Sequence, residues 1–363
     1  MSEEKFLLLT IDFPPDEGGV ARYLASLASH YSDQVEIVCE RHERERDFDS
    51  TAAFPIFRRS LISERGFLRW KKALYFLMKF SKRYKSIIVS HVLPIGTAAF
   101  IAKKITRVPY IVIVHGMDVR LAQNSMRKKI IAKAVLKNAK LVVANSQALA
   151  NEITDVFGVS EVLVIYPCIE KIVPVKTKIK VHEFRLLTVS RLVERKGHLC
   201  TLNALSLLKQ NGRIGNIKYD IVGSGPFEAT LKYVVDELGL DEIVKFHGNV
   251  SDVERDKFYA SSDLFLMPVS NDSVDKEGFG LVFIEAASNG LPAISTKIPG
   301  VDEAILDQKS GILLENQSPQ ELAQIIYELS NNAIKIEEFS LNAREHASKF
   351  TCASQMEKLR PYL

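Results

Sequence analysis

Two glutamates, Glu277 and Glu285, stand eight positions apart around a glycine-rich turn and the start of an apolar segment. The segment after the turn is predicted to be a helix, and amide groups at a helix start attract anions. Eight helical residues rise about 12 Å, which is comparable to the span from the ribose of a nucleotide-sugar to the far side of its hexose. This spacing suggests that Glu285 holds ribose hydroxyls and Glu277 holds sugar hydroxyls. The amides that would face an anion belong to Gly278, Phe279, Gly280 and Leu281.

A basic pair, Arg191 and Lys196, lies at the end of the predicted strand Phe184–Arg191 and just beyond it. A planar guanidinium and a compact ammonium at this spacing can converge on one diphosphate. Taken alone, such a charged run is better interpreted as a solvated loop. For Glu285 the alternative is a solvated helix face, which its apolar neighbours make less favourable because a buried carboxylate needs a partner.

Glycine turns follow two of the predicted strands. Gly18 and Gly19 come after two prolines and before a predicted helix, where a phosphate can approach the backbone closely. A simple turn is an equally good interpretation of this pair. Gly223 and Gly225 begin a segment like a dinucleotide fingerprint, but Glu228 occupies its third glycine position. We therefore reject an NAD-type site and predict a turn that lines a nucleotide pocket.

His115 ends the predicted strand Tyr110–His115, and Asp118 follows it closely. A histidine at the carboxyl end of a strand is well placed to meet a reacting group, although a lone histidine is more often structural. The triplet Asp47-Phe48-Asp49 looks like a metal-binding Asp-x-Asp motif, but it lies in the highly charged, loop-like stretch Arg41–Asp49. We interpret it as solvated surface and predict no metal and no other cofactor.

Short runs rich in Val, Ile and Leu alternate with longer helical patterns, which predicts an α/β fold with parallel sheets. Ligands of such folds bind at the carboxyl ends of the strands. The expected strands of the N-terminal half are Phe6–Asp12, Val35–Glu40, Ser86–His91, Tyr110–His115, Lys140–Asn145 and Val162–Tyr166. Those of the C-terminal half are Phe184–Arg191, Tyr219–Gly223, Val244–Gly248, Leu264–Pro268, Pro292–Thr296 and Gly311–Leu314.

The chain divides into two similar halves. Its 363 residues exceed the size at which one hydrophobic core stops growing. The pattern breaks where two prolines accompany a lysine-rich stretch, which we interpret as a linker. We predict an N-terminal Rossmann-like domain at 1–168, a linker at 169–183, a C-terminal Rossmann-like domain at 184–345, and a C-terminal helix at 346–363. A return of that helix to the first domain is one use for it.

The bulk composition is that of a globular protein, with 47% hydrophobic and 25% charged residues. No apolar run approaches the roughly 18 residues of a spanning helix, and the acidic start does not resemble a signal peptide. The four cysteines are scattered and form no Cys-x-x-Cys pair, which is typical of a reducing compartment. We expect a cytoplasmic protein, and the net charge of +4 gives no reason to expect nucleic acid as a partner.

A basic and aromatic segment stands out at residues 65–85. It carries eight basic residues, no acidic residue and the only tryptophan, and this pattern suits a helix on anionic lipid. A second basic stretch at 127–140 could extend the same face. The alternative is an ordinary amphipathic helix that packs on the sheet. We favour the membrane interpretation, which predicts peripheral association with the inner face of the cytoplasmic membrane and a lipid-linked acceptor.

Taken together, these motifs resemble glycosyltransferase family four, the retaining enzymes with the GT-B fold, in which two Rossmann-like domains face each other across a cleft. The order and spacing of the motifs match over nearly the whole chain. The resemblance implies that Arg191 and Lys196 hold the donor diphosphate, that Glu277 contacts the transferred sugar, and that His115 lies beside the reacting carbon. The implied donor-binding set is Gly18, Gly19, Asp118, Gly223, Gly225, Val250, Gly278, Phe279, Gly280, Leu281 and Glu285.

The resemblance further implies transfer of a hexose-type sugar from a UDP- or GDP-sugar to a glycan or lipid-linked acceptor. In the front-face mechanism favoured for this family, the acceptor attacks on the side from which the diphosphate departs, and no metal is needed. The products would belong to cell-surface polysaccharide, lipopolysaccharide or glycolipid synthesis. A sugar-nucleotide epimerase or hydrolase of the same fold is the main alternative, and an inactive nucleotide-sugar-binding scaffold is another.

Overall fold

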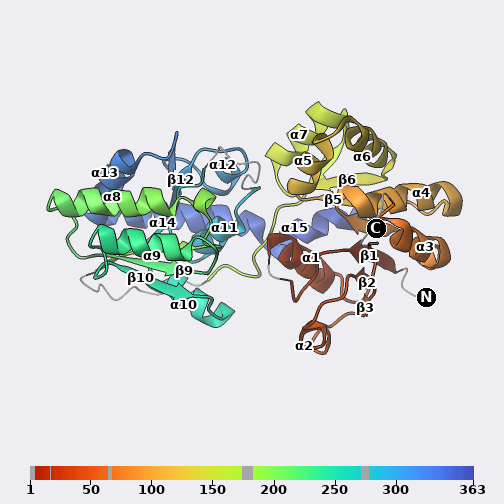
Figure 1. Cartoon of the computed structure of the whole chain (residues 1–363), viewed down its shortest axis with the longest axis horizontal. Coiled ribbons are helices and arrows are strands. Elements are labelled where there is room, and N and C mark those ends of the chain that lie inside the picture. The colour runs from red at the N-terminus through yellow and green to blue at the C-terminus, as the bar shows by residue number, and fades with distance from the viewer. Residues whose placement is uncertain (1–4, 17, 64–67, 174–182, 271–277) are drawn as a thin grey trace. The chain divides into compact units, whose positions relative to one another are not determined.

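The computed structural model describes residues 5–16, 18–63, 68–173, 183–270 and 278–363. The chain forms two compact units. The first contains Met1–Cys168 and Cys352–Leu363, and the second contains Ile169–Thr351. Each unit has a parallel sheet with helices on both of its faces (Figure 1).

The sheet of the first unit has seven parallel strands in the order β3-β2-β1-β4-β5-β6-β7. Both β1 and β5 are buried at every residue, because helices cover the two faces of the sheet and leave no side of the strand in water. The strands are β1 (Phe6–Thr10), β2 (Val35–Cys39), β3 (Ile56–Arg58), β4 (Ile87–Ser90), β5 (Tyr110–Val114), β6 (Leu141–Ala144) and β7 (Val162–Val164).

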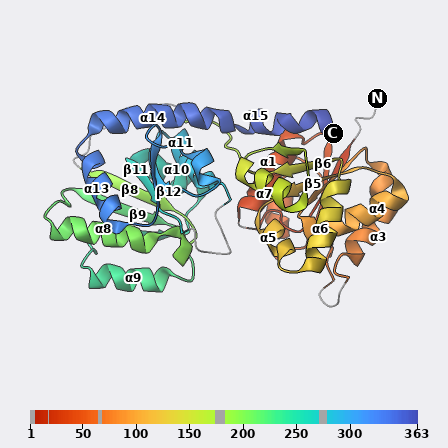
Figure 2. The same ribbon diagram turned by 90° about the horizontal axis from the view of Figure 1, so that it is seen from above.

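Two layers of helices cover this sheet. On one face α3, α4, α6 and α7 bury apolar residues against the strands. On the other face α1 packs beside α15, which comes from the C-terminal end of the chain (Figure 2). The helical segments are α1 (Gly19–His30), α2 (Glu45–Asp49), α3 (Lys71–Phe80), η1 (Ser81–Arg83), η2 (Val92–Gly96), α4 (Thr97–Thr106), α5 (Met117–Gln123), α6 (Met126–Asn138), α7 (Gln147–Phe157), α15 (Cys352–Met356) and η5 (Glu357–Tyr362).

The sheet of the second unit has six parallel strands in the order β10-β9-β8-β11-β12-β13. The order reverses direction at β8 and β11, so the fold is doubly wound and its loops gather at the carboxyl edge of the sheet. The strands are β8 (Phe184–Val189), β9 (Ile217–Val222), β10 (Val244–Gly248), β11 (Leu264–Met267), β12 (Ala293–Thr296) and β13 (Gly311–Leu314).

Helices cover both faces of this second sheet. On one face α8, α9 and α13 share a core with the strands. On the other, Phe265 of β11 contacts Tyr259 of α10 and Phe283 of α11, at ring-centroid distances of 6.1 and 5.6 Å. The helical segments are η3 (Glu194–Lys196), α8 (His198–Gln210), α9 (Glu228–Glu237), α10 (Asp252–Ser261), α11 (Leu281–Ser288), α12 (Val301–Ala304), α13 (Pro319–Ser330), α14 (Ala333–Ala347) and η4 (Ser348–Phe350).

Each of the twelve strands expected from the sequence is present, with ends displaced by at most a few residues. The edge strand β3 was not expected, because it has only three residues and none of them is buried. The interpretation of Arg41–Asp49 as wholly loop-like is wrong, since Glu45–Asp49 forms α2. Acidic residues in its first turn favour this helix, and Arg58 of β3 forms an ion pair with Asp49 at 2.7 Å.

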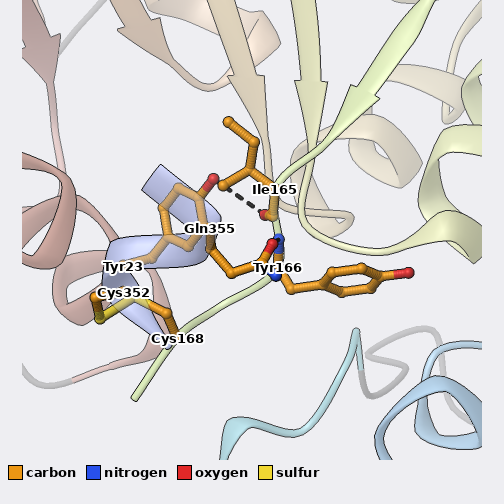
Figure 3. The surroundings of a disulfide bond; sticks show 6 residues. All are labelled: Tyr23, Ile165, Tyr166, Cys168, Cys352 and Gln355. Atoms are coloured by element: carbon orange, nitrogen blue, oxygen red, sulfur yellow. Dashed lines mark hydrogen bonds between the residues drawn. A yellow bond between two sulfur atoms is a disulfide. The ribbon is translucent and has the colours of Figure 1, made fainter. Parts of the chain in front are cut away.

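A disulfide fastens the C-terminal segment within the first unit. Cys168 and Cys352 are 184 positions apart in the chain and are bonded to each other (Figure 3). Beside the bond, the amide of Tyr166 donates to Gln355 Oε1 at 3.1 Å, and Met356 is buried in the core under α1. The sequence analysis did not predict this pairing, because the two cysteines are far apart in the chain. Cys39 and Cys200 are free and buried.

Candidate functional site

In the second unit, the loops that follow β8 and β9 are joined backbone to backbone. The amide of Ser190 donates to the carbonyl of Val222 at 3.0 Å, and the amide of Leu192 donates to the carbonyl of Ser224 at 2.9 Å. The end of β10 joins them, because Gly223 donates its amide to the carbonyl of Gly248, the last residue of that strand, at 2.8 Å. The two loops and the end of β10 are therefore joined at the carboxyl edge of the sheet.

Gly223 and Gly225 are required for this contact between loops. Gly223 has φ 122°, and a Cβ built on it would lie 2.0 Å from the carbonyl oxygen of Ser190. A Cβ on Gly225 would lie 2.3 Å from the carbonyl oxygen of Leu192. Side chains at these positions would force the loops apart, so packing alone accounts for both glycines. Their contact with a nucleotide stays a prediction.

The basic pair lies in the loop after β8, and its two members differ in exposure. Arg191 is exposed, whereas Lys196 is buried, with 8% of its surface accessible. The loop after β11 contacts the residues on either side of Lys196. Ser270 donates its amide to the carbonyl of Arg195 at 2.7 Å, and Gly197 packs against Pro268. These contacts hold the backbone on either side of the buried Lys196.

The glycine-rich turn before α11 reaches the same edge. Gly280 has φ 78° and precedes the first turn of α11, while Phe279 is buried and packs on Phe350 at 5.3 Å. A Cβ on Gly300, in the loop after β12, would lie 2.1 Å from the carbonyl oxygen of Gly278, so these two loops are also in contact. Glu277 lies outside the described residues.

Glu285 sits in α11 with defined partners. Its Oε2 accepts a hydrogen bond from the hydroxyl of the buried Tyr259 at 3.0 Å. Burial alone would lower the pKa of Arg255, but the negative charges of Glu285 and Asp252 outweigh it, and the pKa of Arg255 is raised. A half-buried carboxylate with a phenol and a guanidinium beside it is not a residue of a freely solvated helix face.

Gly18 and Gly19 differ from the glycines of the second unit. A Cβ on either residue would meet no other atom within 4 Å. Gly18 has φ 162°, which is extended backbone that any residue adopts, and Gly19 begins α1. No packing or backbone strain in the first unit therefore requires glycine here, and contact of the pair with a phosphate stays a prediction.

His115 ends a hydrogen-bonded row at the carboxyl edge of the first sheet. Its Nε2 lies 2.8 Å from Ser90 Oγ, and the same hydroxyl lies 3.3 Å from His91 Nδ1. His91 Nε2 lies 3.1 Å from Asp12 Oδ2. Sequence reasoning missed Ser90, His91 and Asp12. Each of these residues lies at the carboxyl end of β4 or β1, or within two residues of it, and the two strands pair with each other. Their places after predicted strands were the signal in the sequence that could have identified them.

The two histidines of this row have opposite pKa shifts. Burial and the neighbouring charge of His91 lower the pKa of His115. Burial also acts to lower the pKa of His91, but the hydrogen bond with Asp12 and the charges of Asp118 and Asp12 outweigh it and raise that pKa. The hydrogen bond with His91 in turn lowers the pKa of Asp12. Near neutral pH, His115 is therefore the uncharged member of the row.

Asp118 ties two loops of the first unit together. Its Oδ1 accepts from the amide of His115 at 3.0 Å, and its Oδ2 accepts from the amide of Val92 at 2.9 Å. The side chain is buried, so it sets the position of the His115 backbone. Direct contact between Asp118 and a donor stays a prediction.

Other predicted features are placed as follows. Val250 is half-buried in the loop between β10 and α10. Among the residues that the structure describes, no group of three or more His, Cys, Asp or Glu side chains is arranged to hold a metal ion. A cavity of about 450 Å³ in the second unit is lined mainly by charged residues, including Arg185, Asp220 and His247, and no residue predicted for the site lines it.

The structure thus gathers the predicted residues at two edges. In the second unit, the loops that carry Arg191, Lys196, Gly223 and Gly225 lie at the same carboxyl edge of the sheet as the turn before α11. In the first unit, Gly18, His115 and Asp118 follow β1 and β5, whose carboxyl ends lie at the same edge of one parallel sheet.

Two family models match the chain. The model for Glycosyltransferase Family 4 matches residues 17–171, and the model for Glycosyl transferases group 1 matches residues 170–346. The amylovoran biosynthesis glycosyltransferase AmsK of Erwinia amylovora is 34% identical over 161 residues, 44% of this chain and 39% of that protein. A GDP-mannose-dependent phosphatidylinositol monomannoside mannosyltransferase of Mycobacterium tuberculosis is 32% identical over 146 residues, 40% of this chain and 37% of that protein. The matched stretch is thus about two fifths of each relative.

Solved structures share the fold over nearly the full chain. HepE of Anabaena in complex with UDP has a TM-score of 0.81 at 21% identity and covers 99% of both chains. A glycosyltransferase of Rickettsia africae has a TM-score of 0.78 at 18% identity, with 99% of this chain and 97% of that chain covered. Within the described ranges, no helix has the length and apolar character to cross a membrane.

Proposed function

Because the chain belongs to glycosyltransferase family four and has the GT-B fold, we propose that it moves a hexose-type sugar from a UDP- or GDP-sugar to a glycan or lipid-linked acceptor, with retention of anomeric configuration. The observation that carries the proposal is the carboxyl edge of the second unit. There a buried lysine, Lys196, lies in a loop that is interlocked with the loop after β11. The chain then reaches the glycine-rich start of α11. Positive charge and helix amides at one edge suit a diphosphate.

In the proposed reaction, the acceptor oxygen attacks the anomeric carbon on the face from which the diphosphate departs. The leaving phosphate takes the acceptor proton. Arg191, Lys196 and the amides at the start of α11 stabilise the charge that develops on that phosphate. In this scheme their positive charge takes the place of a metal. Loss of activity with EDTA, restored by Mn²⁺ or Mg²⁺, would contradict that part of the proposal.

The remaining donor contacts are assigned from the family resemblance. We assign Glu285 to the ribose hydroxyls, since the Tyr259 hydroxyl occupies one carboxylate oxygen and fixes the orientation of the group. Glu277 is assigned to the transferred sugar. His115 is assigned to the side of the reacting carbon, where an uncharged imidazole can hydrogen-bond a sugar hydroxyl.

The names of the relatives support a cell-surface product. One relative acts in amylovoran biosynthesis, another transfers mannose to a phosphatidylinositol mannoside, and a third, from Escherichia coli, is a putative colanic acid biosynthesis glycosyltransferase. Other structures of HepE contain UDP-glucose, or UDP and glucose. We therefore propose a nucleotide-sugar donor and a polysaccharide or glycolipid acceptor for this chain.

We also propose that the first unit binds an anionic membrane surface at the cytoplasmic face. In α3, Ala73 and Leu77 are buried, but Tyr75 is 69% exposed between exposed lysines. In α6, Met126 and Ile130 are 74% and 62% exposed beside a run of basic residues. Exposed apolar side chains within positive charge suit anionic lipid. Failure to bind anionic liposomes at low salt would contradict this part.

The central test is donor turnover with and without an acceptor. UDP-glucose and GDP-mannose are incubated with the protein, alone and with a membrane glycolipid extract, and products are separated by mass spectrometry. Transfer predicts a sugar-extended acceptor and little change without acceptor. Epimerised donor or stoichiometric free sugar in the donor-only sample would favour the epimerase or hydrolase alternative. Lys196→Ala serves as the matched inactive control.

A further inference from the structure

A row of four polar side chains ends on His115, and each of its contacts can be assigned a direction. An ionised carboxylate such as Asp12 only accepts hydrogen bonds, so His91 Nε2, at 3.1 Å, must carry a proton. When His91 is an imidazolium, its Nδ1 also carries a proton and donates to Ser90 Oγ at 3.3 Å. The single hydroxyl proton of Ser90 is then left for His115 Nε2 at 2.8 Å.

This assignment leaves one protonation state for His115. Its Nε2 accepts from Ser90, so an uncharged ring carries its proton on Nδ1. Among the described residues, no protein group hydrogen-bonds Nδ1 of His115. That nitrogen is therefore available as a donor to a group that is not part of the chain.

The backbone at His91 is unusual in a way that supports a specific role. His91 has φ 78°, a conformation that residues with a side chain rarely adopt. Two hydrogen bonds hold it there: its amide donates to the carbonyl of Ile113 at 3.0 Å, and Gly96 donates to its carbonyl at 3.2 Å. Strained positions of this kind cluster at functional sites.

The groups around the two rings favour a charged His91 and an uncharged His115. The charges of Asp12, after β1, and Asp118, in the first turn of α5, both act to raise the pKa of His91. His115 is covered by the ring of Tyr23, at 5.8 Å between centroids, and burial lowers its pKa. The proton of the row thus resides on His91.

We propose that His91, together with Asp12 and Ser90, is a positioning residue that fixes His115 as an uncharged imidazole with its proton on Nδ1. The Nδ1–H group then donates to a hydroxyl oxygen of the sugar. Only this last step rests on the proposed function, because the position of the proton is a property of the free protein.

The test is the tautomer of His115 in the full chain. Long-range ¹H–¹⁵N correlation spectra of ¹⁵N-histidine-labelled protein distinguish Nδ1–H from Nε2–H, and His115→Gln identifies the signal. We expect the Nδ1–H form between the lowered pKa of His115 and the raised pKa of His91, and a smaller share of that form as the pH rises through the pKa of His91. His198 of the second unit is the internal control. Its Nε2 lies 3.1 Å from Ser190 Oγ, it has no second histidine in its hydrogen bonds, and its signal should not change.

Two variants test the row itself. Ser90→Ala removes the bridging hydroxyl and should lower the ratio of Nδ1–H to Nε2–H about fivefold, the equivalent of one hydrogen bond of about 1 kcal/mol. Asp12→Asn should lower the pKa of His91 and move the tautomer change to lower pH. The Asp12 side chain is 43% exposed, so Asp12→Asn should fold. This variant therefore provides the test if Ser90→Ala does not fold.

An Nε2–H form of His115 in the unmodified protein would overturn the inference. So would an unchanged tautomer ratio in a folded Ser90→Ala together with an unchanged pH dependence in Asp12→Asn. A protein with the expected tautomer but no donor turnover would refute the proposed function and leave this assignment intact. Normal turnover with the opposite tautomer would refute this inference alone.

Discussion

Replacing Gly19 with alanine should weaken donor use without weakening the fold. A Cβ at this position meets nothing within 4 Å, and Gly19 lies in the ordinary helical backbone at the start of α1. Alanine also restricts the unfolded chain, so the free energy of unfolding should be unchanged or rise by up to about 1 kcal/mol. Stability therefore gives no reason for glycine at this position.

The loss should appear in the reaction with the donor. If a phosphate rests on the amides at the start of α1, the added methyl group displaces it from the backbone. One hydrogen bond to a charged group contributes about 1.5–3 kcal/mol. Its loss from the transition state corresponds to a fall in kcat/KM of about 10- to 150-fold.

Gly225→Ala is the matched comparison, because its Cβ would lie 2.3 Å from the backbone carbonyl oxygen of Leu192. We expect this variant to melt at a lower temperature than the unmodified protein, whatever its activity. Gly212→Ala controls for the substitution itself. Its Cβ meets nothing within 4 Å, its φ of 65° makes alanine mildly unfavourable, and it lies at the end of α8, outside the predicted site.

The assay is a pair of measurements on each variant: the thermal midpoint, and kcat/KM for UDP-glucose and GDP-mannose. Gly19→Ala should have the thermal midpoint of the unmodified protein but a lower kcat/KM. Gly225→Ala should have a lower thermal midpoint. A Gly19→Ala protein with normal kcat/KM for the accepted donor would refute the reasoning. So would a midpoint that falls as far as that of Gly225→Ala.

Three further predictions concern other parts of the chain. Lys196→Ala and Glu277→Ala should each lower turnover severely while the thermal midpoint stays near normal, and near-normal turnover in Glu277→Ala would remove that residue from the site. Tyr259→Phe deletes the hydroxyl that orients Glu285, the carboxylate assigned to the ribose, so calorimetry should show about fivefold weaker binding of whichever of UDP and GDP the protein binds, from a hydrogen bond of about 1 kcal/mol. Cys168→Ser should raise hydrogen exchange in residues 352–363, and unchanged exchange there would show that packing alone holds the segment.

The strands could be predicted because burial on both faces leaves a clear sequence pattern. Tyr110–Val114 consists of β-branched and aromatic residues, and it forms β5 as expected. The short edge strand Ile56–Arg58 is half-exposed and has no such pattern. The pairing of Cys168 with Cys352 could not be predicted either, since a contact between residues 184 positions apart depends on the whole fold.

Candidate site residues could be predicted from the sequence where the residue type and its position in the chain both indicate a chemical role. Lys196 was predicted for the site from its residue type and its place after a strand, and its role there stays a prediction. The two kinds of glycine look alike in sequence, yet Gly223 is required for loop packing and Gly19 is not. The row from Asp12 to His115 joins residues about a hundred positions apart, so no local pattern reveals it.

The most direct test of the central claim is calorimetric titration of the full chain with UDP-glucose and GDP-mannose, compared between the unmodified protein and Lys196→Ala. One of the two donors should bind the unmodified protein at a single site. Lys196→Ala should weaken this binding about 10-fold or more, the effect of losing one charge-assisted contact with a phosphate. Binding of neither donor, or equal affinity in Lys196→Ala, would show that Lys196 does not hold a donor diphosphate.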